Sequence, residues 1–550
     1  MYRNELESSM SKEPKFLPPL EPDESNLWRS TVFSWAASWR HLLVITAACL
    51  TGLFALFFQE IDVWGTQFFQ ALTGQHEWLG WKMDPTLGVI LGMVLITVSM
   101  IVIMRLRDVF FPGTEGTGIP QAIASLHVKD GPIRSYMLSG RILVGKTILL
   151  CIGLFSGMTI GREGPSVHVG ACFMYLITKI TRFPRHLVQR GLILGGGGAG
   201  IAAAFNAPIA GMIFAMEEIG RSFDKNNAST IVRVVLMASI VVIAILGWDY
   251  LFYGKIEREF GFHMVHWVAV PLVGVVGGLL GGLFSKAVVW GTPVVTRHAR
   301  TRPYLTAAVL GLSLAGIGFA SQGESYGSGY PQAKAMLMYR GTDYYQVLGQ
   351  DQTATSAELF AAYQDKVEHR TLLTSADEIE HEVREIEMAW EVLGNPDERA
   401  FYDQWHRPEG YPWWYPFAKA GGSFFSLVSG IPGGLFDPSL SVGAGLGNLC
   451  ADLCEHIFDE IDPQIVIMLF MVAYFAGVVQ SPITVFVIMI EMTDARFLTL
   501  PLMVSAIMAY EASHLICKKA IYEALAEVFL GNIEKRAKED GIVAEPAEKA

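Results

Sequence analysis

Long apolar stretches without a charged side chain dominate the hydrophobic pattern of this chain. A helix needs about 20 predominantly apolar residues to cross the hydrocarbon core of a bilayer. Uncharged stretches of roughly that length recur along the sequence, so we predict an all-α polytopic membrane protein. They cover residues 42–59, which is slightly short, 85–104, 191–216, 267–285, 303–323 and 463–490.

Two further apolar stretches, residues 147–161 and 420–436, are shorter and rich in glycine. They predict helices that stop partway across the bilayer. Irregular backbone at membrane depth is tolerated only where it is buried in protein or lines a cavity. We therefore expect half-spanning helices around an internal site.

Composition and charge separate one segment from the rest. The chain has 51% hydrophobic and 17% charged residues, well below the roughly 25% charged residues of soluble domains. Residues 341–415 hold 16 acidic and 5 basic residues, so they account for most of the net charge of -12. We interpret 341–410 as a small acidic soluble insert between membrane regions 31–340 and 411–532. The polar ends, residues 1–30 and 533–550, are expected to be cytoplasmic.

Basic residues predict the orientation. Arginines gather at 105–107 and at 297–302, and positively charged loops favour the cytoplasmic side. The region 60–84 carries a single lysine and is predicted to be an outer loop. One crossing over 303–323 then places the acidic insert on the outer face.

Three motifs occur twice in the same order. Residues 116–122 (GTGIPQA) return as 327–333 (GSGYPQA), and the serine–glycine pair and PSVHVGA segment at 156–171 return at 429–444. Pro208 and Glu217 return as Pro482 and Glu491, and we interpret Glu491 as structural. The offset between copies grows from 211 to 273 across the acidic insert. The order predicts two inverted repeats with a substrate site where their broken helices meet.

The chemistry of the repeated motifs favours an anion. Glycine and proline at helix starts leave backbone N–H groups and the positive end of the helix dipole facing the same space. Thr117 adds a hydroxyl donor, and the glycines at 433–434 let bare backbone approach a ligand. Alternatively, these glycines only allow helices to pack closely.

Four motifs together carry a resemblance to a known family. They are Gly-Thr-Gly-Ile-Pro at 116–120, Gly-Arg-Glu-Gly-Pro at 161–165, Gly-Leu-Phe-Asp-Pro at 434–438 and the late tyrosine Tyr522. The chain resembles the CLC chloride channels and chloride/proton antiporters of prokaryotic type. That resemblance implies a homodimer of inverted-repeat subunits in the plasma membrane, each with one chloride pathway.

The resemblance also implies roles for individual residues. Glu163 corresponds to the gating glutamate, although on its own it could be an ion pair with Arg162. Glu218 corresponds to the internal proton acceptor of the antiporters, which favours a chloride/proton antiporter over a passive voltage- or pH-gated chloride channel; an exposed helix end would also explain it. The implied anion-binding residues are Thr117, Tyr522, Arg162, Gly164 and the backbone amides of Leu435 and Phe436.

Several residues depart from the family pattern. Asp437 stands where a small residue is usual, and its charge could weaken anion binding or cap a helix. Thr117 and Gln121 replace the more frequent serine and glutamate. Because the hydroxyl is kept, chloride stays the expected anion.

The insert has a resemblance of its own. Segments 343–349, 389–393 and 395–403 resemble a J domain of the DnaJ type, but the His-Pro-Asp tripeptide is replaced by Glu-His-Arg-Thr at 368–371. We expect a J-like fold without cochaperone activity. A membrane-anchored chaperone adaptor is the third functional hypothesis.

Other function classes lack support in the sequence. It contains no P-loop and no zinc-protease spacing, and Cys450 and Cys454 are interpreted as buried thiols. We expect no enzymatic activity, no cofactor, no metal and no nucleic-acid partner. The expected ligands are chloride and protons, and the partners are the lipid bilayer and a second copy of the chain.

Overall fold

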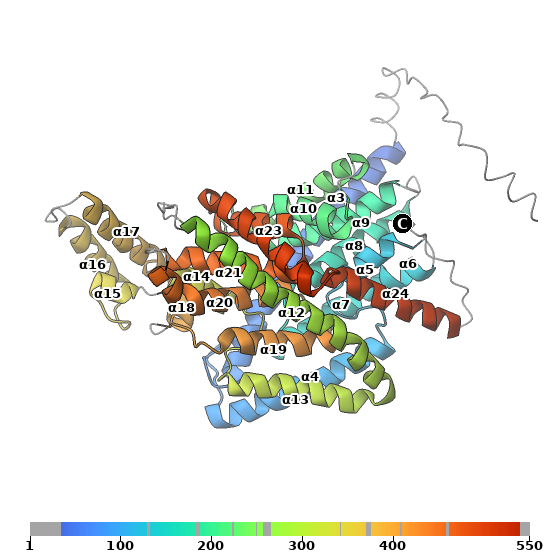
Figure 1. The fold of residues 1–550 in the computed structure, drawn as a ribbon, viewed down its shortest axis with the longest axis horizontal. Coiled ribbons are helices and arrows are strands. Elements are labelled where there is room, and N and C mark those ends of the chain that lie inside the picture. Colours follow the sequence, from blue (N-terminus) through green and yellow to red (C-terminus); the bar gives the residue numbers. More distant parts are fainter. Residues whose placement is uncertain are drawn as a thin grey trace, which may run out of the picture. The chain divides into compact units, whose positions relative to one another are not determined.

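The fold is known from a computed structural model (Figure 1). It describes residues 35–539 apart from 129–131, 182–186, 223–224, 249, 257–265, 341–342, 370–375, 408–409 and 458–460. Packing divides the chain into Met1–Thr46 and Ala47–Ala550. The described part of the first unit is the beginning of one helix, α3, and all contacts below belong to the second unit.

Up to Ile219, the described part of the first repeat holds eight regular α-helices and one π-helical turn, η1. The predicted apolar stretch 191–216 is not one span: it breaks into α9 and α10, because Asn206 takes a left-handed conformation and Pro208 starts a new helix. The elements are α3 (Trp35–Leu72), α4 (Pro85–Val109), α5 (Ile119–Leu126), α6 (Pro132–Met137), α7 (Gly140–Phe155), α8 (Glu163–Ile180), α9 (Leu187–Phe205), α10 (Pro208–Phe214) and η1 (Ala215–Ile219).

The second repeat follows the same plan. The predicted stretch 463–490 is likewise broken, at left-handed Gln480 and before Pro482. Helix α11 (Lys225–Leu246) still belongs to the first repeat, because it begins 274 residues before α23. The elements of the second repeat are α12 (His266–Thr301), α13 (Pro303–Ala320), α14 (Tyr330–Met338), α19 (Tyr415–Val428), α20 (Phe436–Ile457), α21 (Pro463–Val479), α22 (Pro482–Thr493), η3 (Arg496–Leu498) and α23 (Thr499–Ile516), followed by α24 (Ile521–Glu539).

Seven helices of the described chain are long and apolar enough to cross a membrane. Others, such as α5, α14 and α19, are far shorter, as expected for half-spanning helices. The outer loop predicted at 60–84 is shorter than expected, because α3 continues to Leu72. Together these elements form the predicted all-α polytopic fold.

Small residues let the helices pack closely. Helix α12 lies against α21 and α23, and α8 lies against α9 (Figure 1). At Gly278 an added Cβ would lie 2.3 Å from the carbonyl oxygen of Ala509, and at Gly170 an added Cβ would overlap the backbone of Gly196. Close backbone contact of this kind is typical of helix interfaces in membranes.

The two repeats hold each other through reciprocal contacts. Glu217 accepts hydrogen bonds from the amides of Ile483 and Thr484 at the start of α22, at 3.1 and 2.6 Å. Its counterpart Glu491 accepts from the matching amides at the start of α10, at 3.0 and 2.6 Å. Exchanged helix caps are the pattern that a pseudo-two-fold axis between inverted repeats produces. Glu491 is therefore structural, as predicted.

The insert forms four helices between α14 and α19. The stripe predicted along 379–393 is confirmed where it is described: Ile386 and Leu393 are buried, and Trp390 stacks on Tyr363 at 5.1 Å. Residues 370–371 of the segment that replaces His-Pro-Asp lie outside the described residues. The helices are α15 (Tyr344–Leu348), α16 (Ser356–His369), α17 (Ala376–Leu393) and α18 (Pro396–Trp405).

Helix α18 ties the insert to the membrane region. Glu398 accepts hydrogen bonds from Lys334 of α14 at 3.0 Å and from the Tyr339 hydroxyl at 2.8 Å. The insert adjoins the end of α13 near Ala320, whereas Arg105 contacts Tyr304 at the other end of that helix. The insert therefore lies opposite the basic end of the bundle.

Candidate functional site

A buried lysine holds the loop that contains Thr117. Lys146 of α7 donates to the carbonyl oxygens of Thr114 and Gly116, at 3.0 and 2.5 Å. Gln121 donates to the carbonyl oxygen of Glu115 at 2.5 Å. The Thr117 hydroxyl, buried at the start of α5, is thereby fixed in place. The residue type at 121 serves this scaffold.

Helix α8 starts directly beside this loop. A Cβ added at Gly164 would lie 2.8 Å from the Thr117 carbonyl oxygen and 2.9 Å from its Cβ. Glycine is required there because any side chain would push α8 away from α5. Two of the predicted anion-binding residues are thus neighbours, and the amino ends of two helices converge.

Glu163 is the first residue of α8 and is fully buried. Its Oε1 accepts a hydrogen bond from the Arg162 amide at 3.2 Å, and its Oε2 has no hydrogen-bond partner in the described chain. Gly161 and Gly434 exchange backbone hydrogen bonds, and a Cβ on either would overlap Oε2. The carboxyl group therefore lies where the two repeats meet.

Tyr522 closes the other side of the site. Its ring stacks on that of Phe436, with centroids 6.4 Å apart and planes 20° apart. Its hydroxyl is buried without a hydrogen-bond partner in the described chain. Leu435 and Phe436 lie at the start of α20, where helix geometry leaves backbone amides without intrahelical partners. An orphan hydroxyl beside free amides can bind an anion.

Arg162 is buried next to the gate. Its guanidinium lies 5.5 Å from the centre of the Phe252 ring, and its charge interacts with Asp62 and Asp437. The contact that connects it to the Glu163 carboxyl runs through its backbone amide. A simple surface ion pair does not describe this arrangement.

Glu218 lies inside the protein, in η1. It is 1% exposed, so the interpretation as an exposed helix end is wrong. One carboxyl oxygen accepts a hydrogen bond from the Ser481 hydroxyl, and the other has no partner in the described chain. Tyr522 lies within electrostatic range of both Glu218 and Glu163. Tyr522 thus interacts with both predicted proton-carrying groups.

Asp437 does not cap its helix. It is the second residue of α20 and is fully buried, but neither carboxyl oxygen has a hydrogen-bond partner in the part of the chain described. Capping requires such a bond to a backbone amide, so that alternative is wrong.

Three residues near the site were missed from the sequence. Lys419 donates to three carbonyl oxygens of the loop before α14, and the Ser328 hydroxyl in that loop donates to Asp62 at 3.2 Å. The repeat offset could have found two of them, since Lys419 corresponds to Lys146 and Ser328 to Thr117. Asp62 interrupts an apolar helix, which also marks it.

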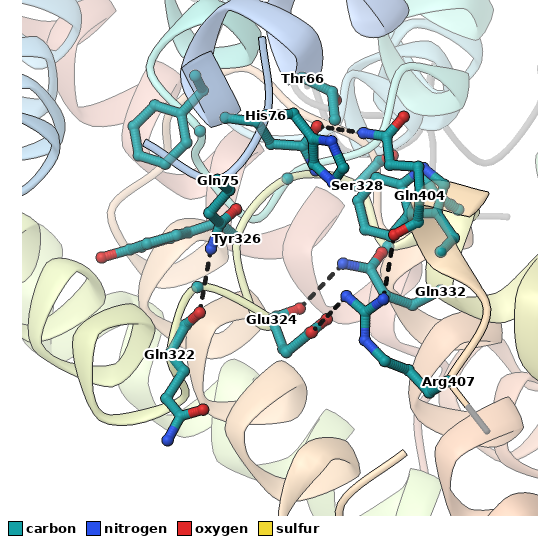
Figure 2. Close-up of a pocket in the computed structure, with 18 residues that line it drawn as sticks. Thr66, Gln75, His76, Gln322, Glu324, Tyr326, Ser328, Gln332, Gln404 and Arg407 are labelled. Carbon is teal, nitrogen blue, oxygen red and sulfur yellow. Dashed lines mark hydrogen bonds and ion pairs between the residues drawn. The ribbon is translucent and has the colours of Figure 1, made fainter. Parts of the chain in front are cut away.

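Two pockets approach the site from opposite ends. The one at the basic end has a volume of about 160 Å³ and is lined by Thr117, Arg107 and Arg300 together with α24. The other, of about 270 Å³, lies at the insert end and is lined by Ser328, His76 and Arg407 among others (Figure 2). Arginines line both mouths together with acidic groups, Asp108 and Glu115 at the first and Glu324 at the second.

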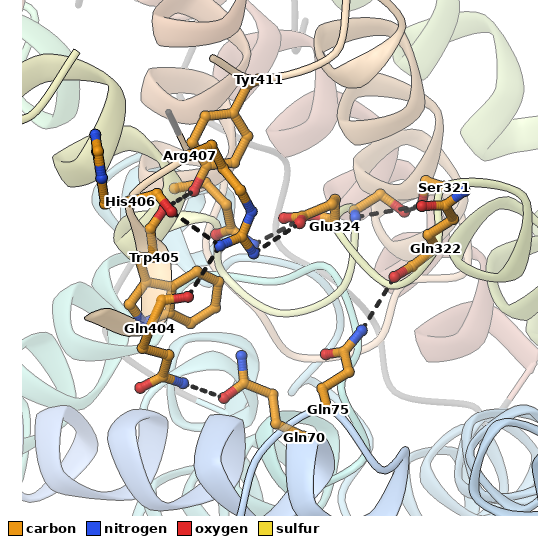
Figure 3. A network of polar contacts seen from close by, with 12 residues as sticks. Gln70, Gln75, Ser321, Gln322, Glu324, Gln404, Trp405, His406, Arg407 and Tyr411 are labelled. Carbon is orange, nitrogen blue, oxygen red and sulfur yellow. Dashed lines mark hydrogen bonds and ion pairs between the residues drawn. The ribbon is translucent and has the colours of Figure 1, made fainter. Parts of the chain in front are cut away.

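The insert supplies part of the wall of the second pocket. Arg407 forms an ion pair with Glu324 at 3.0 Å, and Gln404 donates to Gln70 of α3 at 2.5 Å (Figure 3). Burial, with the nearby cations Lys82 and Arg407, lowers the pKa of His76 below its usual value, which favours a neutral ring. The pocket at the insert end is thus built jointly by the insert and the membrane region.

Comparison with known proteins agrees with this architecture. The family model described as Voltage gated chloride channel matches residues 98–514. The H(+)/Cl(-) exchange transporter ClcA of Vibrio parahaemolyticus is 26% identical over 469 residues, which cover 84% of both chains. H(+)/Cl(-) exchange transporter 5 of Sus scrofa is 24% identical, over 76% of this chain and 50% of its own length.

Solved structures share the fold. A slow cyanobacterial Cl-/H+ antiporter superposes with a TM-score of 0.65 and 21% identity, over 89% of this chain and 97% of its own. A CLC-type fluoride/proton antiporter gives a TM-score of 0.61 and 16% identity, over 89% and 98%. At these identities the likeness concerns the fold alone.

Proposed function

The chain belongs to the voltage-gated chloride channel family, and we propose that it is a secondary antiporter that moves chloride across a prokaryotic plasma membrane in exchange for protons. Bacterial and animal relatives named H(+)/Cl(-) exchange transporters support this proposal. The observation that carries it is the burial of Glu218, which like Glu163 interacts electrostatically with Tyr522.

Chloride binding follows from the dehydrated groups around Thr117. The hydroxyls of Thr117 and Tyr522 and the amides of Leu435 and Phe436 replace water around the anion. Helix dipoles at the start of α5 and α20 add positive potential. Arg162 and Gly164 belong to the outer part of the same pathway.

Proton movement follows from the two glutamates. An ionised Glu163 competes with chloride, because its carboxylate seeks the same positive potential. Protonation removes that competition and frees the anion position. Glu218 exchanges protons with the inner solution and passes them toward Glu163. Each replacement of the Glu163 carboxylate by chloride at the anion position is thereby linked to the movement of a proton.

Reconstitution into liposomes tests the coupling. An imposed chloride gradient should drive protons against their own gradient. In Glu218→Gln, chloride flux should persist and proton movement should stop, because the amide cannot carry a proton. Chloride flux without any proton movement in the unmodified protein would instead support a passive chloride channel.

Glu217→Gln is the matched control. The two glutamates are adjacent, but Glu217 spends both carboxyl oxygens on capping α22. The control should keep proton coupling. Equal loss of coupling in both variants would assign the effect to disturbed structure.

Further proposals follow from membership of this family. We propose a homodimer, no cofactor, no catalysis of a chemical reaction, and a J-like insert that faces outward. The position of the insert opposite the basic end of the bundle supports that orientation. Stimulation of an Hsp70 ATPase by the full-length protein would favour the chaperone adaptor.

A further inference from the structure

Asp437 is the least explained charged residue in the pathway. It is fully buried at the start of α20, and both carboxyl oxygens lack a hydrogen-bond partner among the described residues. A buried carboxylate without partners is costly unless it is neutral or faces compensating charge. Its role therefore depends on the groups around it.

The surroundings of Asp437 hold more acid than base. Its strongest electrostatic partner is Glu163, followed by Arg162 and Asp62, and Lys419 interacts with it as well. Glu324 also interacts with Lys419, so the carboxyl groups outnumber the basic groups and full ionisation of the cluster is unfavourable. Four tyrosine hydroxyls interact with the same cluster. They belong to Tyr250, Tyr253, Tyr330 and Tyr522.

Hydrogen bonding indicates where a proton resides in this cluster. Asp62 accepts a hydrogen bond from the Ser328 hydroxyl at 3.2 Å, so its carboxyl group has a donor of its own. Glu163 Oε2 and both oxygens of Asp437 accept no hydrogen bond from a donor group of the described chain, but the two carboxyl groups lie within hydrogen-bonding reach of each other. Two neighbouring carboxyl groups in such a place cannot both be ionised.

We propose that Asp437 and Glu163 share one proton, so that Asp437 acts as a proton-sharing residue for the outer gate. This inference rests on the proposed function, in which Glu163 gates chloride. In the transfer step the O–H bond of Asp437 breaks and an O–H bond forms on Glu163, with no other reactant. Asp437 then keeps the negative charge beside Arg162.

The repeat register explains how this residue reached the gate. Asp437 occupies, in the second repeat, the position of Gly164 in the first, at the offset of 273. Gly164 leaves room next to Thr117, whereas Asp437 places a carboxyl group in the mirrored place. The second copy thereby supplies a proton site where the first supplies an anion site.

A shared proton predicts that the pH dependence of chloride flux changes when Asp437 is replaced. Two adjacent carboxyl groups favour the form of the pair that holds one proton, because two like charges repel each other. Removal of the charge in Asp437→Asn should move the midpoint of chloride flux against pH to lower pH, by about one unit or more. Asp437→Glu, which keeps the carboxyl group, should stay within about half a unit of the original midpoint.

The decisive experiment measures chloride and proton flux against pH in liposomes for the unmodified protein and for Asp437→Asn. Asp437→Ala provides the same test if the asparagine variant does not fold. An unmoved midpoint would overturn the inference. If the unmodified protein moved chloride without protons, the proposed function would fail, and the midpoint shift would still decide the role of Asp437.

Infrared difference spectroscopy gives a readout independent of transport. At neutral pH the unmodified protein should show the carbonyl band of a protonated carboxyl group that disappears in both Asp437→Asn and Glu163→Gln. Survival of that band in both variants would contradict a shared proton.

Discussion

The loop before α5 and the loop before α14 are two copies of one scaffold, but the hydroxyl groups that they carry have different partners. In each, a buried lysine from a following helix binds loop carbonyl oxygens, and Gln121 and Gln332 donate back to the loop. Each loop also donates one backbone hydrogen bond to the other repeat: the amide of Gly116 donates to the carbonyl oxygen of Gly430, and that of Gly327 to the carbonyl oxygen of Gly157.

The two loops differ in the surroundings of their hydroxyl groups, those of Thr117 and Ser328. Thr117 lines the inner pocket and lies beside Gly164, whereas Ser328 donates to the carboxylate of Asp62. In the second loop, the hydroxyl group thus already has a carboxyl group of the protein as its acceptor. Duplication supplies two positive, anion-attracting ends, and single side chains decide which of them receives a transported ion.

Removal of the scaffold lysines should have the largest effect. Lys419→Met orphans the carbonyl oxygens of Tyr326 and Gly327, since that of Ser325 keeps its hydrogen bond from Thr159, and Lys146→Met likewise orphans two. Each orphaned group costs about 1–3 kcal/mol, although relief from burying an ammonium offsets part of it. Thermal unfolding followed by tryptophan fluorescence should show both variants destabilised to a similar extent. Unfolding temperatures equal to that of the unmodified protein would show that the two lysines do not stabilise their loops.

The hydroxyl exchange addresses the difference directly. Thr117→Val should weaken chloride binding roughly 10- to 100-fold, because a hydrogen bond to a charged group is worth about 1.5–3 kcal/mol. Ser328→Ala should change chloride affinity less than about threefold, since it loses a contact to Asp62 instead. Calorimetric titration with chloride measures both, and Thr117→Ser is the control that keeps the hydroxyl. Similar losses at the two sites would mean that both copies bind the anion.

The exchanged caps should respond alike. Glu217→Gln and Glu491→Gln each replace a carboxylate that accepts two backbone amides. The expected loss is about 0.5–2 kcal/mol for each. Equal losses of unfolding free energy in the two variants would support the symmetry of the two caps. A large difference between the losses would show that the repeats depend on each other unequally.

The outer ion pair should matter least. Arg407 and Glu324 keep 38% and 19% of their side chains exposed, so the pair is worth about 0–1 kcal/mol. Arg407→Ala should leave unfolding almost unchanged. A loss of several kcal/mol would mean that the insert braces the membrane region.

Much of this arrangement was predictable from the sequence. Matching motifs gave the repeats, the offset located the insert, and the glycine-rich starts of α5, α8 and α20 indicated an anion site. These predictions rest on backbone chemistry that is local to each motif. The structure brings Thr117, Gly164, Glu163, Phe436 and Tyr522 together as expected.

Other features depend on contacts that the sequence does not display. The breaks at Asn206 and Gln480 fall inside uncharged stretches, and only the following prolines mark them. The caps by Glu217 and Glu491 join residues more than 260 positions apart. Asp437 was noted as unusual, but its lack of a cap and its coupling to Glu163 follow only from the packing of α20 against α8.

A crystal structure with bromide in place of chloride tests the central claim most directly. The account predicts anomalous density between the hydroxyls of Thr117 and Tyr522, close to the amides of Leu435 and Phe436, and none beside Ser328. Bromide at Ser328, or a Thr117 site that stays empty at a bromide concentration sufficient for transport, would contradict it.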